Sequence, residues 1–371
     1  MKTTAAVLLE PGKPWEILTL ELDAPKHGEV LVRFVASGLC HSDEHLRDGS
    51  LPSRYPIVGG HEGAGIVEEV GPGVVGLAPG DHVVCSFLPA CGRCRYCATG
   101  RENLCDLGAN AMEGCLPDGT FRFHLGEADL GGMCMLGTFS ERAVISEHAC
   151  VKIDPSIPLT AAVLVGCGVP TGWGAAVNSG GVRAGDTVVI YGVGGIGINA
   201  VQGARLAGAR HVVVVDPVAF KRETATKLGA THVLETAEQA HELVVELTRG
   251  QLADVAIVTS SVAASEVITA GFDVIGKGGV LVIVSLAPPE LNITLSSLAL
   301  VTYEKQVRGS LFGSSNPHFD IPRMLDYYRD GLLELDHLVT SRYSLEQVNE
   351  GYRDLLDGKN IRGIIEFEKN G

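Results

Sequence analysis

The sequence is poor in positive charge and has no long apolar run. Its 29 Lys and Arg residues stand against 44 Asp and Glu residues, so the formal net charge is −15 at pH 7. Nucleic acids and anionic membranes are recognised by clustered basic side chains, so this balance argues against both as partners. A membrane helix needs about 20 consecutive apolar residues, and the longest apolar segments, at 212–215 and 280–286, are far shorter.

The N-terminus also lacks the pattern of a secretory signal. It reads as a short strand that ends in a turn at Glu10-Pro11-Gly12. We therefore expect a cytoplasmic protein, in which the ten cysteines serve metal or thiol chemistry rather than disulfides.

Length and texture indicate more than one domain. The 371 residues exceed the roughly 100–200 that one domain usually holds, and no internal repeat or low-complexity tract is visible. The first half is rich in strands and turns, with strands expected at 29–36 and 65–70. From about residue 169 strands alternate with helices, which predicts an α/β fold with a doubly wound parallel sheet. The expected strands are 187–191, 212–216, 255–259 and 280–284, and the expected helices are 197–207 and 221–228.

The C-terminal part changes rhythm again after about residue 309. Helices are expected at 321–330 and 345–357, followed by a last strand at 363–367. This order fits a cofactor domain inserted between two parts of a second domain.

A glycine-rich turn marks a nucleotide site. Gly192-Val193-Gly194-Gly195-Ile196-Gly197 follows an expected strand and opens an expected helix, which is the context that gives the G-x-G-x-x-G pattern its meaning. Gly192 permits the tight turn, Gly194 lets the backbone approach a pyrophosphate, and Gly197 lets helix and strand pack closely. The free N–H groups of the helix N-terminus then face the phosphates.

Asp216 ends the next expected strand, 19 residues after Gly197. Its carboxylate could accept hydrogen bonds from the ribose hydroxyls and would repel a 2′-phosphate, which favours NAD over NADP. Lys221 follows closely enough to reach the adenosine ribose. The alternative is a glycine-rich turn with a capping Asp, without a ligand.

Four cysteines are crowded into one short segment. Cys91, Cys94, Cys97 and Cys105 give the spacing C-x2-C-x2-C-x7-C. Four thiolates suit a closed tetrahedral site, for which zinc is the favoured ion, and a closed site is structural. Reduced thiols or an iron–sulfur cluster are the alternatives. The remaining cysteines outside ligand patterns, Cys85, Cys115, Cys134 and Cys150, read as buried thiols.

Three dispersed elements supply a second ligand set. Cys40, His61 and Cys167 lie in GLCHSD, GHE and GCG. Each alone is more often a packing residue, but together two thiolates and an imidazole bind zinc and leave a fourth position open, the set known from alcohol dehydrogenase.

The chain resembles the zinc-dependent medium-chain alcohol dehydrogenase family along essentially its whole length. The stretches GGHEGAG, the four-cysteine segment, GCGVPTGWGA and GVGGIG occur in the family's order. The resemblance implies a GroES-like, β-rich catalytic domain at 1–168 and 312–371, with a structural-zinc lobe at 91–105. It implies a Rossmann domain that binds NAD at 169–311.

Within this family, ASGLCHSDEHLR, CLPDGTFRFH and FGSSNPHFDIPR are similar to the nitrosodimethylaniline (NDMA)-dependent alcohol dehydrogenases of actinobacteria. These enzymes keep NAD(H) bound and recycle it with an external electron acceptor. Mycothiol-dependent formaldehyde dehydrogenases are the alternative, and a homodimer or homotetramer is expected by the same resemblance.

Site roles follow from the resemblance. Cys40, His61 and Cys167 would bind catalytic zinc, Asp43 would orient His61, and Glu62 would lie behind the metal. The two zinc ions per chain would divide between this set and the lobe. Zinc lowers the pKa of an alcohol hydroxyl, so an alcohol could be oxidised to an aldehyde by hydride transfer to NAD, and the aldehyde reduced in reverse.

Further residues of the active site are implied in the same way. Ser42 would take the alcohol proton in a chain that ends at His45, and Phe87 would line the substrate pocket. Thr171 and Arg362 match cofactor-contacting positions. His41 replaces the Arg that many members place against the pyrophosphate, so that contact is weaker.

Several of these assignments have simpler alternatives. Ser42 could cap a helix that starts near Asp43, His45 could be a solvated helix residue, and Phe87 could belong to the core. A zinc-free quinone reductase of the same fold would lack the three dispersed ligands. A zinc-binding adaptor without catalytic activity would explain the lobe but not the nucleotide motif.

Overall fold

The computed structural model describes residues 1–260, 265–286 and 291–367. The chain divides into two units, the first made of Met1–Cys167 with Asn316–Gly371 and the second of Gly168–Ser315. The second unit is thus an insertion within the first. Its two boundaries lie one and four residues from those expected, at 167 against 168 and at 316 against 312.

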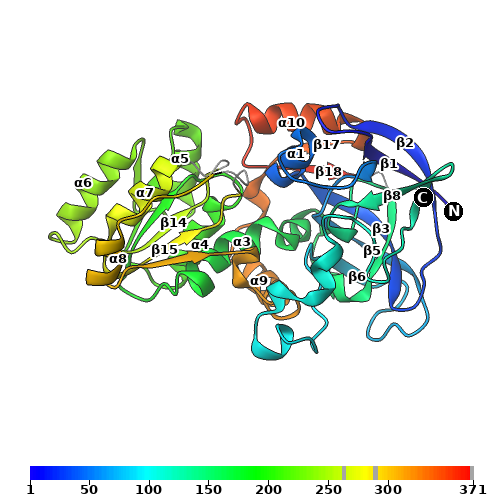
Figure 1. The fold of residues 1–371 in the computed structure, drawn as a ribbon, viewed down its shortest axis with the longest axis horizontal. Helices are drawn as coiled ribbons and strands as arrows, with labels where there is room; N and C mark the ends of the chain where they lie inside the picture. The colour runs from blue at the N-terminus through cyan, green and yellow to red at the C-terminus, as the bar shows by residue number, and fades with distance from the viewer. Residues whose placement is uncertain (261–264, 287–290, 368–371) are drawn as a thin grey trace. The chain divides into compact units, whose positions relative to one another are not determined.

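The first unit is built on β-structure (Figure 1). A closed barrel has the order β1-β2-β7-β8-β4, formed by Lys2–Leu8, Glu16–Leu22, Phe123–Leu125, Ala128–Gly132 and Ile57–Val58. A seven-stranded sheet has the order β10-β6-β5-β3-β18-β17, with β9 also paired to β3. Its strands are Cys150–Lys152, His82–Cys85, Gly63–Val70, Glu29–Gly38, Arg362–Glu366, Val339–Tyr343 and Arg142–Ser146.

The C-terminal segment returns to this sheet in register. β18 pairs antiparallel with β3, so Ile364 lies opposite Gly38 at the end of β3 that leads into Cys40. The helices of the first unit are α1 (His41–Asp48), α2 (Leu159–Ala162), α9 (Pro317–Arg329) and α10 (Val348–Leu356).

The second unit holds a six-stranded parallel sheet with helices packed on it (Figure 1). The order β13-β12-β11-β14-β15-β16 is 3-2-1-4-5-6 in chain order, the arrangement of a doubly wound nucleotide-binding fold. The strands are His232–Leu234, His211–Val215, Thr187–Tyr191, Ala253–Val258, Ile275–Ile283 and Gln306–Gly309. The helices are α3 (Gly168–Gly174), α4 (Gly197–Leu206), α5 (Ala219–Lys227), α6 (Ala237–Leu247), α7 (Ser265–Val274) and α8 (Ser297–Thr302).

The α/β fold class predicted from the alternation is confirmed, and most of the expected elements coincide with observed ones. The strand expected at 187–191 is β11 residue for residue. The helix expected from residue 321 begins earlier, at Pro317, because the Asn316 side chain accepts a hydrogen bond from the His318 N–H and caps the helix there. Pro317 occupies the first turn, where a missing N–H costs least, whereas Pro322 lies inside the helix and removes one i→i−4 hydrogen bond.

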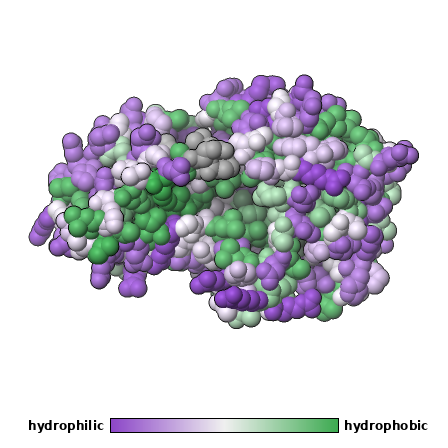
Figure 2. Space-filling view, in the orientation of Figure 1, coloured by the Kyte–Doolittle hydropathy of each residue, from purple (hydrophilic) through white to green (hydrophobic). Residues whose placement is uncertain are grey.

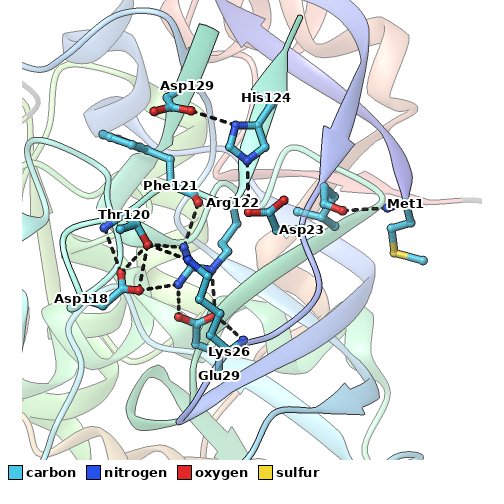
Figure 3. A network of polar contacts seen from close by, with 11 residues as sticks. Met1, Asp23, Lys26, Glu29, Asp118, Thr120, Phe121, Arg122, His124 and Asp129 are labelled. Atoms are coloured by element: carbon cyan, nitrogen blue, oxygen red, sulfur yellow. Dashed lines mark hydrogen bonds and ion pairs between the residues drawn. The ribbon is translucent and has the colours of Figure 1, made fainter. Parts of the chain in front are cut away.

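A buried ion-pair network ties the barrel to the large sheet in the first unit (Figure 3). The Arg122 guanidinium donates to both carboxylate oxygens of Glu29, the first residue of β3, and also to Asp118 at 2.8 Å. Arg122 and Glu29 are almost fully buried, with side-chain exposures of 1% and 5%. This places Arg122, from the CLPDGTFRFH stretch, in a structural role.

Among the described residues, no single helix is long and apolar enough to cross a membrane. One bent pair, Leu159–Gly166 with Gly168–Ser179, meets that test by length and composition.

Candidate active site

Four potential ligands from distant parts of the sequence converge in the first unit. Cys40 precedes α1, His61 and Glu62 precede β5, and Cys167 follows a 3-10 helix at Val163–Gly166. One ligand atom of each residue lies within 4.8 Å of those of the others, and all four residues are buried. The three dispersed ligands expected from the sequence therefore form one cluster, joined by Glu62.

Glycines make this convergence possible. A Cβ at Gly38 would lie 2.1 Å from Glu62 Oε2, so only glycine lets β3 pass this close to the carboxylate. Gly60 adopts φ +83°, a left-handed conformation that favours glycine. A Cβ there would lie 2.5 Å from the Phe139 ring. The turn that presents His61 is therefore fixed by its neighbours on both sides.

The thiols of Cys40 and Cys167 form a coupled pair. The hydrogen bond from Cys167 lowers the pKa of Cys40 well below its usual range, against the effect of burial. The same hydrogen bond raises the pKa of Cys167 well above its usual range. A cation that binds both sulfur atoms must displace any thiol proton that they hold, as zinc does with thiol ligands.

Asp43 holds the imidazole of His61. Oδ1 of Asp43 accepts a hydrogen bond from the Gly60 N–H at 3.0 Å and lies 3.3 Å from His61 Nδ1. Burial acts to lower the pKa of His61, but the Asp43 carboxylate raises it well above the usual value. With Nδ1 directed to Asp43, Nε2 is the nitrogen left for a metal ion.

Glu62 and Arg362 form a buried ion pair within the same cluster. Burial raises the pKa of Glu62 to about 7, although the charge of Arg362 acts to lower it. Oε1 of Glu62 is buried without a hydrogen bond. Arg362 was expected to contact the cofactor; the structure places its guanidinium on Glu62, and a cofactor contact stays a prediction.

Three further residues of α1 were assigned to the active site from the sequence, and one of them, Ser42, contacts Cys40. Ser42 Oγ lies 3.6 Å from Cys40 Sγ, and the helix N-cap is Cys40. Ser42 therefore lies inside the helix, and the alternative that it caps α1 is wrong. His45, three residues further, is half-buried with Nδ1 3.0 Å from Ser50 Oγ. His41, also half-buried, is the first residue of α1.

Phe87 contacts His61, one of the candidate ligands. Its half-buried ring meets that of His61 edge to face, with centroids 5.8 Å apart. It also packs on the core of the first unit. This contact fits the interpretation of Phe87 as a core residue, and its contact with His61 fits the interpretation as a residue of the substrate pocket.

The four-cysteine segment folds into a second cluster. The sulfur atoms of Cys91, Cys94, Cys97 and Cys105 all lie within 4.8 Å of one another, and the Cys91–Cys97 and Cys94–Cys105 pairs are each 4.0 Å apart. A tetrahedron with Zn–S bonds of about 2.3 Å has edges of about 3.8 Å, so this spacing suits zinc. Backbone N–H groups of Cys97 and Asp106 lower the pKa of Cys94 to about 6, which favours the thiolate.

The glycine-rich turn of the second unit has the features of a phosphate cradle. Gly192 adopts φ +85°, and a Cβ at Gly197 would lie 1.9 Å from the Gly192 carbonyl oxygen. A Cβ at Gly194 would meet nothing within 4 Å. Gly194 thus borders open space at the start of α4, where the helix N-terminus favours an anion. The residues present fit a bound dinucleotide.

Asp216 is held beside this turn. Its Oδ2 accepts the Val193 N–H at 2.9 Å and its Oδ1 accepts the Val218 N–H at 2.9 Å. Lys221 is half-buried in the first turn of α5. Thr171, buried in α3, adjoins Gly172, where a Cβ would lie 2.0 Å from the Ile196 carbonyl oxygen.

Sequence reasoning missed two side chains near these sites. Arg222 donates to the Asp216 carbonyl oxygen at 2.6 Å, one helical turn beyond Val218, and Tyr352 lies behind Asp43. Neither belongs to a local motif; only the position of Arg222 one helical turn beyond Val218, close after Asp216, could have pointed to it.

The remaining thiols and the large cavity lie outside the ligand sets. Cys85, Cys115, Cys134 and Cys150 are free, and all but the half-buried Cys134 are buried. A cavity of about 660 Å³ in the first unit, bordered by His27, His148 and His318, includes none of the cluster around Cys40.

Comparison with known proteins agrees with both units. The profile of the alcohol dehydrogenase GroES-like domain matches residues 26–155, and that of zinc-binding dehydrogenase matches residues 195–328. The NDMA-dependent alcohol dehydrogenase of Amycolatopsis methanolica is 63% identical over 366 residues, which cover 98% of this chain and 99% of that protein.

More distant relatives cover the chain as fully. The S-(hydroxymethyl)glutathione dehydrogenase of Paracoccus denitrificans is 36% identical over 374 residues, 98% of this chain and all of that protein. The crystal structure of an alcohol dehydrogenase zinc-binding domain protein from Burkholderia ambifaria superposes with a TM-score of 0.94 at 34% identity, covering 99% of each chain.

The chain belongs to the zinc-binding medium-chain alcohol dehydrogenase family. It is an oxidoreductase that acts on CH–OH groups. The adaptor hypothesis is thereby excluded. The formaldehyde dehydrogenase alternative has weaker support, since the relative named for a thiol-adduct substrate is far less similar than the NDMA-dependent enzyme.

Proposed function

We propose that this protein interconverts alcohols and aldehydes with NAD that stays bound between turnovers and is recycled by an external electron acceptor. The observation that carries the proposal is the buried cluster of Cys40, His61 and Cys167, three donors that leave a zinc ion one open position. Glu62 lies in the same cluster and is paired with Arg362. The name of the 63% identical relative supports the acceptor. The open space in front of Gly194 supports a dinucleotide, and Asp216 beside it favours NAD.

Residues of the first unit have separate roles in the proposed oxidation of an alcohol. Zinc, when bound by Cys40, His61 and Cys167, supplies a Lewis acid that lowers the pKa of an alcohol hydroxyl. Ser42, beside Cys40, receives the hydroxyl proton, and His45, on the same face of α1 at the i+3 position, takes it towards solvent. Phe87 covers the His61 ring and would limit water at the reacting carbon. The glycine turn at 192–197 would hold NAD, which would supply the hydride acceptor.

We propose two zinc ions per chain, the second in the four-cysteine lobe, whose sulfur spacing supports a tetrahedral site. All ten cysteines are free thiols, which supports a reducing compartment and hence the cytoplasm.

We propose a homodimer or homotetramer, and the second unit supports this. Within residues 1–260, 265–286 and 291–367, β16 is an edge strand of its sheet, and an open edge strand invites pairing. Large apolar side chains of α8 and its neighbourhood are exposed, most of all Leu298 (73%) and Val301 (72%). Figure 2 shows apolar residues gathered over this part of the second unit, and an apolar surface beside an open edge fits an association face.

The experiment that tests the proposal uses freshly purified protein. The protein is denatured, the released nucleotide is identified and counted, and zinc is measured per chain. Alcohol oxidation is then assayed with added NAD+ alone and with an added nitroso acceptor. Near-stoichiometric NAD(H), with turnover only when the acceptor is present, is expected. Protein free of nucleotide that turns over with added NAD+ alone would make it an ordinary exchanging dehydrogenase.

A further inference from the structure

Asp43 has one carboxylate oxygen that the contacts around His61 leave incompletely satisfied. Asp43 is fully buried, and its Oδ1 accepts the Gly60 N–H. Oδ2 lies 3.3 Å from His61 Nδ1 but forms no hydrogen bond with the residues that the structure describes. A buried carboxylate oxygen normally has such a donor, so the surroundings of Oδ2 bear on how firmly Asp43 holds the imidazole.

Tyr352 is the side chain that can supply this donor. It belongs to α10, which packs alongside α1 in the first unit (Figure 1). Its hydroxyl oxygen is buried and, like Oδ2, has no hydrogen-bond partner among the described residues. Burial and then the Asp43 charge raise the pKa of Tyr352 well above its usual value. A phenol, with an ordinary pKa of about 10, is protonated at neutral pH and can donate to the carboxylate.

An aromatic cluster fixes the tyrosine ring in this place. The Tyr352 ring centroid lies 6.2 Å from that of Trp15 and 6.3 Å from that of Phe139. Trp15 is in turn held by Asn349, which lies three residues before Tyr352 on α10 and both donates to and accepts from the Trp15 backbone, at 2.9 and 3.0 Å.

The same cluster sets the turn that carries His61. A Cβ at Gly59 would lie 2.5 Å from the Trp15 ring, and one at Gly60 would lie 2.5 Å from the Phe139 ring. The position of the tyrosine hydroxyl and the position of the imidazole are therefore fixed by one rigid group of rings.

We propose that Tyr352 is a positioning residue for His61. Its hydroxyl donates to Asp43 Oδ2, which holds the carboxylate in the plane that receives the His61 Nδ1–H and so directs Nε2 towards the metal position. Partners behind a metal-bound histidine fix its tautomer and ring orientation and tune its basicity. This inference rests on the proposed role of His61 as a zinc ligand.

The test compares Tyr352→Phe with the wild type as zinc-loaded protein. Loss of a partner behind a ligand commonly weakens metal binding or activity by about 10–100-fold. We expect zinc to be lost from the catalytic site at least about tenfold faster to a chelator. We also expect the visible bands of the cobalt-substituted site to shift, and kcat to fall with little change in KM. Unchanged zinc loss together with an unchanged cobalt spectrum would overturn the proposal.

Tyr343→Phe is the matched control. Tyr343 belongs to the same core cluster and is also buried, but its hydroxyl donates to Asp354 at 2.9 Å. Its removal should leave zinc loss and the cobalt bands unchanged. If the control changes them as much as Tyr352→Phe does, the effect belongs to core packing and the positioning role fails.

A double variant isolates the Tyr352–Asp43 contact from any general loss of stability. If the hydroxyl acts through the carboxylate, Tyr352→Phe adds little to the zinc loss of Asp43→Asn. Additive effects would contradict the proposal. A wild-type protein that holds zinc only in the four-cysteine lobe would instead refute the proposed function, so the two failures are distinguishable.

Discussion

At the scale of single residues, the candidate ligands Cys40, His61, Glu62 and Cys167 depend on one another and on their neighbours for charge and position. Cys40 and Cys167 share a hydrogen bond that separates their pKa values. Glu62 is buried with Arg362, and His61 is held by Asp43. Removing one member therefore changes the charge state of the others, and effects within the cluster should not be additive.

Replacing Cys40 with Ser should lower kcat more than about 100-fold while the fold persists. The hydroxyl is a poor zinc ligand compared with a thiolate, and the glycine turn lies in the other unit and should still bind nucleotide. Zinc per chain should fall from two to one, as measured by elemental analysis beside kcat and the released nucleotide. Cys115→Ser, a buried thiol outside both ligand sets, is the control and should stay active. Activity near the wild-type level in Cys40→Ser would remove Cys40 from the metal site.

At the scale of elements, the sequence predicted those binding sites whose residues lie close together along the chain. The glycine turn at 192–197 and the lobe at 91–105 could be interpreted directly, because phosphate binding and a closed thiolate site both use residues a few positions apart. The strand β11 could be bounded by its run of β-branched residues. The start of α9 was placed late, at residue 321, because the capping role of Asn316 was not recognised from the sequence.

Contacts between distant segments could not be predicted in this way. Arg362 meets Glu62 across 300 positions, through the pairing of β18 with β3. Tyr352 reaches Asp43 from α10. No local pattern marks either contact, since each depends on the C-terminal segment returning to the first unit, which only the family resemblance implied.

The network of Figure 3 leads to a stability prediction for the first unit. Arg122→Met should lower the free energy of unfolding by about 3–5 kcal/mol, because it leaves the Glu29 charge buried and unpaired. Arg342→Met is the matched control: its partner Glu366 is in an exposed pair, with side-chain exposures of 53% and 37%. Removing an exposed pair costs about 0–1 kcal/mol. Chemical unfolding followed by tryptophan fluorescence measures both, and equal losses would show that the Arg122 network adds no more than a surface pair.

The four-cysteine lobe should act on stability rather than on chemistry. Cys97→Ser removes one of four sulfur ligands, and structural zinc contributes free energy to folding. We expect zinc to be lost from the lobe and Tm to fall by several degrees, while the cluster around Cys40 keeps its ion. Calorimetry with zinc analysis checks this. The assignment fails if zinc leaves the lobe and Tm does not change.

At the scale of the whole molecule, β16 is one of the two edge strands of the second unit's sheet among the described residues, the other being β13. Within the described parts of the chain, β16 pairs with β15 alone, and α8 exposes Leu298 and Val301 nearby. A charge of −15 per chain opposes association in general, so any dimer must be held by a local apolar face rather than by nonspecific attraction.

Val301→Lys should therefore shift the protein from oligomer towards monomer. A lysine near the C-terminal end of α8 suits the helix dipole, so the helix itself should persist, whereas burying the ammonium group in an association face is unfavourable. Val75→Lys is the control, because Val75 is 84% exposed but lies in a loop of the first unit. Sedimentation at several concentrations should show a dissociation constant raised at least about tenfold, some 1.4 kcal/mol, for Val301→Lys and unchanged for Val75→Lys. A Val301→Lys protein that keeps the wild-type sedimentation profile would place the association face elsewhere, and the exposed side chains of α8 would then need another partner.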